Sequence, residues 1–262
     1  MWWGHLVAAL GDVRVDDLDD ATIRPLRRRL GTRRTTFNRC LALLIASMNR
    51  AGCLHTDHPI RRVRRYKEKQ KTRVLSRDEN HRLNDALNEW RKKKGGWRYA
   101  DLLALLILTG LRRDEWRLGR WEWVNWTLAL YNIPETKTGA RTVYLSAPAL
   151  EILMNIHRAG GNPARGFIFP AVRDKRKAMS WSWTTWRRLI ATAGISDVRC
   201  HDLRHTAGSY AHSFAGLSQR AVADLLGHSR LETSGRYIHD DEKRRAAEAV
   251  AKAVTEDWKP SN

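Results

Sequence analysis

The segment from Tyr99 to Thr109 constrains the fold most, because it is apolar on almost every side. A helix at a protein surface keeps a polar face toward water, and this segment, taken as a helix, has almost none. It is therefore predicted to be a buried central helix that ends at Gly110. Other parts of the chain must cover it, so we expect a mostly helical domain around it.

Several flanking segments have the periodicity of helices that bury one face. They are residues 76–91, 148–157, 181–193, 201–214 and 241–254. The first opens with the capping box Ser76-Arg-Asp-Glu79. In the helix at 181–193 the predicted buried stripe is Trp183, Trp186, Leu189, Ile190 and Ala193.

The stretch between residues 121 and 145 has the composition of strands instead, with a turn at Thr138-Gly139. It predicts a small three-stranded antiparallel sheet. The predicted fold class is therefore mainly α (α+β), a mostly helical domain with one small sheet.

Residues 1–58 are interpreted as a small helical lobe that precedes this domain. Its clearest helix is predicted over residues 35–51 and ends at Gly52. The residues expected to face inward are Phe37, Leu41, Leu44, Ile45 and Met48. A basic linker is expected at residues 59–73, and the larger domain at residues 74–262.

The net charge of +20 over 262 residues is too high for a neutral cytosolic enzyme that acts on small molecules, and it favours a nucleic acid partner. A membrane surface is the alternative, but no long uncharged apolar run supports it. The three cysteines, Cys40, Cys53 and Cys200, have no pattern of a disulfide scaffold. We therefore expect a reducing, intracellular location and no membrane partner.

Candidate site residues gather between Cys200 and His239. The first predicted helix of this stretch begins near His201-Asp202 and places Arg204 on the side away from its apolar stripe. That stripe is Leu203, Ala207, Tyr210, Ala211 and Phe214. A helix N-terminus beside a histidine and an arginine suits an anion, because its free N–H groups, dipole and guanidinium are all positive.

A second helix in this stretch is predicted to begin at Ser218 and to stop at Gly227, directly before His228. A short third segment then carries Arg236 and Tyr237, and the tyrosine lies nine residues after His228. The order of histidine, arginine, histidine and tyrosine is the most specific pattern in the chain.

The strings HDLRH, LLGHS and RY in this stretch resemble the C-terminal signature of the tyrosine recombinases, which include the phage integrases. Upstream, the segment from Thr109 to Glu115, TGLRRDE, resembles the first conserved box of that family. The segment from Glu135 to Val143, ETKTGARTV, resembles its lysine hairpin. These motifs stand in the family's order, and the resemblance covers residues 75–239. The resemblance implies a site-specific DNA recombinase of the phage or mobile-element integrase kind.

Cleavage of a phosphodiester without a metal needs a side-chain nucleophile, cations on the phosphate oxygens and a proton donor for the leaving group. The resemblance implies that Tyr237 attacks the phosphate and forms a 3′-phosphotyrosyl link, with no cofactor or ATP. It implies further that Arg112 and Arg204 bracket the phosphate, because the guanidinium fork matches its geometry.

The remaining roles also come from the resemblance. Lys137 would protonate the leaving 5′-oxygen, His201 would act as acid or base near the tyrosine, and His228 would hydrogen-bond a phosphate oxygen. Glu115 is expected to hold geometry. His201 and His205 stand four apart, a spacing that can bind zinc, but no third ligand supports a metal site.

Contacts to DNA are expected mainly from the N-terminal lobe and the linker. In the family, the core-binding domain places helices of this kind along the DNA, and the lobe here is expected to be a truncated version. The proposed DNA-contacting residues are Arg33, Arg34, Arg39, Arg61, Arg65, Lys67, Lys69 and Arg73. The basic run in the linker could equally be a solvated, flexible face. Crossing phosphates is the favoured interpretation.

The resemblance also implies a homo-tetramer on double-stranded DNA at attachment-type sites, with accessory DNA-bending or excision factors as further partners. The helix at 241–254 is the expected tail that docks on the next subunit. Two other functions remain open: a type IB topoisomerase-like enzyme that nicks and reseals one duplex, and a DNA-binding remnant without catalysis.

Overall fold

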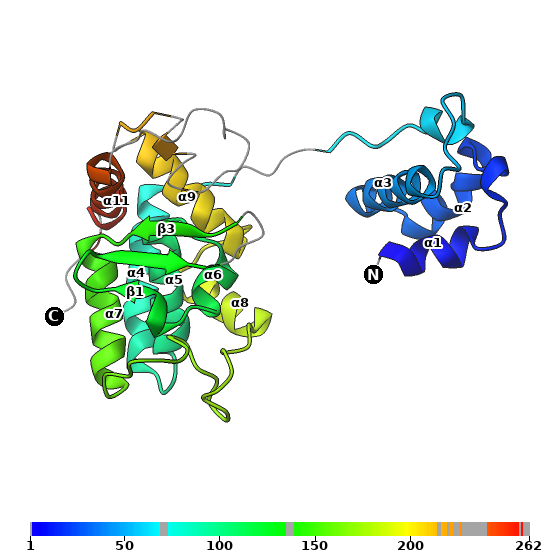
Figure 1. The fold of residues 1–262 in the computed structure, drawn as a ribbon. Coiled ribbons are helices and arrows are strands. Elements are labelled where there is room, and N and C mark those ends of the chain that lie inside the picture. Colours follow the sequence, from blue (N-terminus) through cyan, green and yellow to red (C-terminus); the bar gives the residue numbers. More distant parts are fainter. Residues whose placement is uncertain are drawn as a thin grey trace. The chain divides into compact units, whose positions relative to one another are not determined.

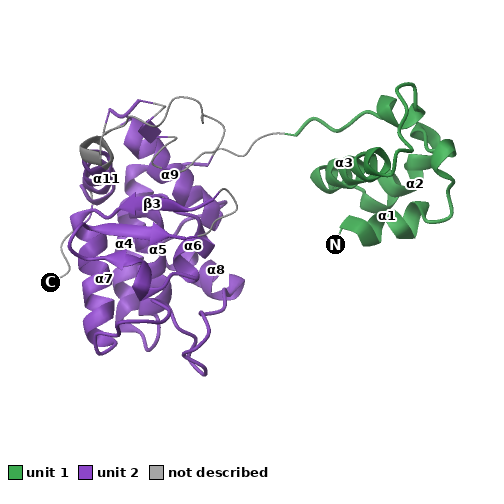
Figure 2. Cartoon of the chain, viewed as in Figure 1, with its two compact units in different colours: residues 1–71 green, residues 72–262 purple. Residues whose placement is uncertain are grey.

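The computed structural model describes residues 2–68, 73–134, 139–213, 216–218, 221–222, 226, 240–256 and 258 (Figure 1). The chain divides into two compact units, residues 1–71 and 72–262 (Figure 2). Each unit buries an apolar core of its own. Among the described helices, none is both long enough and apolar enough to cross a bilayer.

The N-terminal unit is helical. Its elements are α1 (Trp2–Leu10), the 3₁₀ turn η1 (Val15–Asp17), α2 (Asp20–Leu30), α3 (Arg34–Arg50) and the 3₁₀ turn η2 (Pro59–Arg62). Asp19 caps α2 through a reciprocal capping box with Thr22. The predicted helix at 35–51 is confirmed as α3, and of its five predicted inward residues Phe37, Leu41 and Met48 are buried.

The basic segment after His58 packs on this unit over its first half. Ile60 and Val63 are buried in the core of the N-terminal unit. The side-chain amide of Asn38 accepts from the backbone N–H of Tyr66 at 2.9 Å and donates to its carbonyl at 2.8 Å. The unit therefore extends past residue 58, because apolar residues between the charged ones reach its core.

The C-terminal unit surrounds one buried helix. Its helices are α4 (Arg77–Lys92), α5 (Trp97–Thr109), α6 (Arg113–Arg117), α7 (Ala147–Ala159), α8 (Trp183–Thr192), α9 (Cys200–Ser213) and α11 (Asp240–Thr255). Every residue of α5 from Ala100 to Thr109 is buried, and α4, α7, α9 and α11 all pack against it. The predicted central helix is therefore confirmed. The capping box of Ser76 and Glu79 at the start of α4 is confirmed as well.

A small sheet covers part of this helical unit. The 3₁₀ turn η3 (Trp121–Trp123) leads into β1 (Val124–Asn125), which is followed by β2 (Leu130–Ile133) and β3 (Arg141–Tyr144). The order is β1-β2-β3, all antiparallel, and Tyr131 stands opposite both Val124 and Val143. The predicted fold class, mainly helical with a three-stranded antiparallel sheet, is confirmed.

One predicted core residue lies at the surface. Trp183 was expected in the buried stripe of the helix at 181–193, but its exposed fraction is 55%. The helix α8 begins at Trp183, and its buried positions are Trp186, Leu189 and Ile190. Trp183 therefore lies before the first inward turn of the helix, so the prediction for this residue is wrong.

Helix α11 packs within its own unit. We expected the segment 241–254 to dock on a neighbouring subunit, whereas α11 lies against α5, α7 and α9 of the same chain. Its buried face is Ala246, Ala247, Val250, Ala251, Ala253 and Val254. The small alanine side chains on this face let α11 approach its neighbours closely. The helix is therefore part of the core of the C-terminal unit in this structure.

Candidate active site

A tight turn between α5 and α6 places the first candidate arginine. Gly110 ends α5 in the left-handed conformation, with φ of +62°, and its N–H donates to the carbonyl of Leu106. A Cβ at residue 110 would lie 2.4 Å from Cδ2 of Leu226, so this turn accepts only glycine without a shift of that side chain. Two residues later, Arg112 forms the N-cap of α6.

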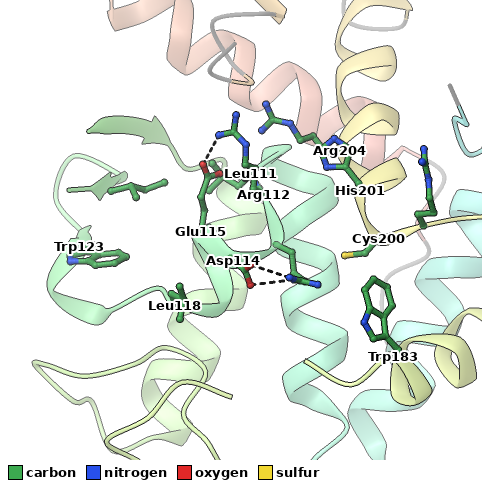
Figure 3. A pocket seen from close by; sticks show the side chains of 13 residues that line it. Leu111, Arg112, Asp114, Glu115, Leu118, Trp123, Trp183, Cys200, His201 and Arg204 are labelled. Carbon is green, nitrogen blue, oxygen red and sulfur yellow. Dashed lines mark hydrogen bonds and ion pairs between the residues drawn. The ribbon is translucent and has the colours of Figure 1, made fainter. Parts of the chain in front are cut away.

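Glu115 holds Arg112 in place. Its Oε2 accepts from the backbone N–H of Arg112 at 2.7 Å, and its Oε1 accepts from the guanidinium Nη1 of the same residue at 2.9 Å (Figure 3). The side chain of Glu115 is only 8% exposed, whereas that of Arg112 is 35% exposed. The buried Glu115 therefore fixes Arg112, while part of the Arg112 guanidinium remains open to solvent.

Arg204 on α9 is buried, with an exposed fraction of 3%. Its Nη1 donates to the carbonyl oxygen of Gly110 at 2.7 Å, and its Nη2 donates to the carbonyl oxygen of Leu226. Burial, followed by the nearby charges of Arg112 and Arg141, lowers the pKa of Arg204 to about 10. The side chain is therefore still a cation at neutral pH, held rigidly by two backbone dipoles.

The face of α9 that carries Arg204 is covered as well. The sequence predicted only that this face lies away from the apolar stripe, and in the structure Gly110 and Leu226 cover it through their contacts with Arg204. A Cβ at Gly208, one turn further along this face, would lie 2.9 Å from Cδ1 of Leu226. Glycine at position 208 therefore lets the side chain of Leu226 approach α9 closely.

His201 stands in the first turn of α9 and is exposed at the surface. Its ring meets that of His205 edge to face, with the ring centroids 4.9 Å apart. Partial burial, and then the charges of His205 and Arg204, lower the pKa of His201 below its ordinary value of 6.5. The imidazole is therefore neutral at pH 7 and can accept a proton.

These residues share one cavity of about 620 Å³ (Figure 3). The lining residues used below are Arg112, Glu115, Arg199, Cys200, His201 and Arg204. Figure 3 shows the two guanidinium groups of Arg112 and Arg204 beside each other, with His201 next to Arg204. The structure thus brings together three of the six predicted catalytic residues around a cationic hollow that can hold an anion.

The other three predicted catalytic residues, Lys137, His228 and Tyr237, lie outside the described residues, as does Lys69 among the predicted DNA contacts. The remaining predicted contacts on the N-terminal unit are all exposed, and they are Arg33, Arg34, Arg39, Arg61, Arg65 and Lys67. Arg73 belongs to the C-terminal unit and is paired with Glu79. Its charge is thus already matched by a carboxylate.

Arg141 is a site residue that the sequence interpretation missed. Its Nη2 donates to Oε2 of Glu115 at 3.2 Å, and its Nη1 donates to the carbonyl oxygen of Leu226 at 2.7 Å. A signal was present in the sequence, because side chains alternate along a strand and Arg141 shares the inward face of β3 with Val143. An arginine at an inward strand position is rare unless it has partners.

No metal site is evident in the part of the chain that the structure describes, where no three His, Cys, Asp or Glu side chains lie close enough to share an ion. Cys200 lines the cavity, but burial raises the pKa of its thiol to about 12. It is therefore no nucleophile at neutral pH.

Comparison with known proteins gives a consistent match. Residues 73–244 match the sequence model of the Phage integrase family. The shufflon-specific DNA recombinase of Escherichia coli is 28% identical over 243 residues, which are 89% of this chain and 56% of that protein. The chain thus spans little more than half the length of this curated relative.

Solved structures of lambda integrase share the fold at 18% sequence identity. A dimer bound to a COC′ core site matches with a TM-score of 0.61, over 87% of this chain and 85% of that one. A tetramer bound to a Holliday junction matches with a TM-score of 0.66, over 87% of this chain and 69% of that one. The likeness covers both units of the chain.

Proposed function

This chain belongs to the phage integrase family, and we propose that it is a site-specific tyrosine recombinase that cleaves and rejoins DNA. The observation that carries the proposal is the convergence of Arg112, Arg204 and His201 on one cavity. A phosphodiester in that cavity would meet two guanidinium forks and one neutral imidazole, which supply the cations and the proton acceptor that phosphoryl transfer without a metal requires.

In the proposed reaction the phenolic oxygen of Tyr237 attacks the scissile phosphorus. The bond from tyrosine to phosphorus forms as the bond to the 5′-oxygen breaks, and a 3′-phosphotyrosyl link and a free 5′-hydroxyl result. His201 takes the phenolic proton, and Lys137 gives a proton to the leaving oxygen. Attack by a 5′-hydroxyl of another strand reverses these steps, so no ATP is consumed.

The electrostatic part of catalysis belongs to Arg112 and Arg204, which are already held in place by other groups of the protein. Arg204 is fixed by two carbonyl groups before any substrate binds, and Arg112 is fixed by Glu115. Donors that are already oriented stabilise the charge that develops on the phosphate oxygens without having to reorganise during the reaction. His228 would add one hydrogen bond to the same phosphate.

The proposed partner is double-stranded DNA at attachment-type sites. The exposed arginines and lysines of the N-terminal unit would neutralise phosphates, which supplies affinity without sequence specificity. Because a lambda integrase has been solved as a tetramer on a Holliday junction, we also propose a homo-tetramer as the active assembly. Accessory DNA-bending or excision factors would act on that assembly.

A suicide substrate tests the proposal. The protein is incubated with nicked duplexes that carry the sequences flanking its coding region, so that cleavage releases a short strand and traps the covalent adduct. We expect a 3′-phosphate attached to Tyr237, and Tyr237→Phe is expected to abolish the adduct while DNA binding persists. Tyr66→Phe, which keeps the ring that packs on Phe37, is the matched control and should form normal adduct.

Two results would contradict the proposal. Cleavage by Tyr237→Phe at the normal rate would show that another group is the nucleophile. Relaxation of supercoils without any exchange between two duplexes would indicate a topoisomerase-like enzyme instead.

A further inference from the structure

Arg141 joins three segments of the candidate site. It lies on β3, binds Glu115 of α6 and binds the carbonyl group of Leu226. Arg204 donates to the same Leu226 carbonyl, so one backbone oxygen receives two guanidinium groups. Leu226 directly precedes Gly227 and the predicted phosphate ligand His228 in the sequence. Arg141 thus shares an acceptor with each of the two candidate phosphate-binding arginines, Glu115 with Arg112 and the Leu226 carbonyl with Arg204.

The cluster has more positive charge than its own carboxylate can balance. Arg112, Arg141 and Arg204 surround Glu115, which pairs directly with the first two. The cluster therefore has two positive charges in excess, and burial lowers the pKa of both Arg141 and Arg204. A phosphodiester has one negative charge, and a second develops on its oxygens during attack. The excess charge of the cluster matches that transition state.

Arg141 itself does not line the cavity where the phosphate would lie. Its side chain is 13% exposed. Its Nε is buried and has no hydrogen-bond partner among the described residues. Arg141 therefore acts through its neighbours and is not in contact with the substrate.

On the basis of the proposed recombinase function, we propose that Arg141 is a positioning residue for DNA cleavage. Its guanidinium fork fixes Glu115 and the Leu226 carbonyl together. Glu115 orients Arg112, and the Leu226 carbonyl orients Arg204. Loss of the fork lets both phosphate-binding guanidiniums move while DNA affinity, which the exposed cations supply, is retained.

A purely structural role would look different. Arg91 and Asp101 form another partly buried ion pair in the same unit, at 2.6 Å, and neither residue lines the cavity. Arg91→Gln therefore reproduces the loss of such a pair without touching the site. It is the matched control for Arg141→Gln.

The experiment measures single-turnover adduct formation on nicked suicide duplexes by wild type, Arg141→Gln, Arg141→Lys and Arg91→Gln. Each variant is also tested on a duplex with a 5′-bridging phosphorothiolate, whose sulfur leaves without needing a proton. The Kd for DNA and the urea midpoint are measured in parallel. We expect Arg141→Gln to slow adduct formation by about 100-fold, with little change in Kd and no restoration by sulfur. Arg91→Gln should lower only the urea midpoint.

Arg141→Lys keeps the charge but cannot span both acceptors with one fork. We expect it to be slowed less than Arg141→Gln, and it carries the test if Arg141→Gln does not fold. The proposal is overturned if Arg141→Gln, or Arg141→Lys in its place, is no slower than Arg91→Gln. Restoration of its rate by the sulfur substrate would also overturn it, because Arg141 would then serve the proton donor on the Lys137 hairpin. If wild type forms no adduct on either substrate, the recombinase function itself fails.

Discussion

Two groups of arginines, one in each unit of the molecule, differ sharply in their exposure to solvent. On the N-terminal unit, Arg33, Arg34 and Arg39 are exposed at the start of α3. In the C-terminal unit, Arg204 is 3% exposed and the side chain of Arg141 is 13% exposed. The first group is exposed to solvent, whereas the second is held by carbonyl groups and one carboxylate.

This difference in exposure suits the two groups of arginines to different tasks, DNA binding and DNA cleavage. An exposed cation attracts phosphate through a high dielectric, releases counterions and loses its effect as salt rises. A buried cation has already lost its water, so it acts on a phosphate through a lower dielectric and needs no reorientation. We therefore expect the exposed arginines to set how tightly DNA binds, and the buried ones to set how fast it is cut.

The largest expected effect comes from the most deeply buried cation. Arg204→Gln removes a fixed charge and is expected to slow adduct formation by roughly 10²–10³-fold, with DNA affinity little changed. Arg204→Lys keeps a charge but not the fork, so it should recover only part of the loss. Single-turnover rates at saturating DNA measure both variants.

Arg199 offers the matched control for Arg204. It lines the same cavity, but its side chain is 52% exposed and is paired with Asp202. We expect Arg199→Gln to slow adduct formation by less than about tenfold. Equal losses in Arg199→Gln and Arg204→Gln would break the distinction between buried and exposed cations.

Local patterns in the sequence were sufficient for most of the fold. The apolar run of α5 and the capping box at Ser76 each depend on residues within a few turns, so periodicity and capping chemistry identify them. Trp183 was misplaced, because a helix start is read less reliably than a helix interior. The packing of α11 on its own unit depends on partners far away in the sequence.

In the candidate site, too, local sequence motifs identified some residues, whereas features that depend on distant contacts were not predicted. The motif order identified Arg112, His201 and Arg204, and the structure places them at one cavity. Burial of Arg204 could not be predicted, because its acceptors at Gly110 and Leu226 come from distant segments. Arg141 was missed for a related reason, since an arginine on a short strand is usually exposed unless a tertiary partner such as Glu115 draws it inward.

The second prediction concerns the exposed group. Replacing Arg33, Arg34 and Arg39 together by glutamine should weaken DNA binding by roughly 10- to 100-fold at moderate salt. Each lost phosphate contact should flatten the dependence of log K on log salt by about 0.9, or about 2.7 for all three. Titrations at several salt concentrations measure the slope. The cleavage rate at saturating DNA should remain that of wild type.

Helix α2 supplies the control for this triple variant. Arg24, Arg28 and Arg29 are also exposed, so their replacement by glutamine changes the net charge equally. If position at the start of α3 matters, the α2 variant should change the salt slope less. An equal change of the salt slope in both variants would assign the effect to overall charge. A slower cleavage step in the α3 variant would show that the exposed arginines also contribute to catalysis.

The smallest expected effect tests whether neighbouring charges change the titration of the exposed His201 imidazole. Burial lowers the pKa of His201 below 6.5, and the charges of His205 and Arg204 lower it further. If His201 accepts the tyrosine proton, the cleavage rate should stay level from pH 8 to about 6.5 and fall at lower pH, as the imidazole becomes protonated. His205→Gln removes one of the charges that lower the pKa, so the acid limb of the profile should move toward neutral pH.

His212→Gln, at a histidine on the last turn of α9, is the control and should leave the profile unchanged. A profile that His205→Gln does not move would show that the exposed imidazole is insensitive to the charges around it.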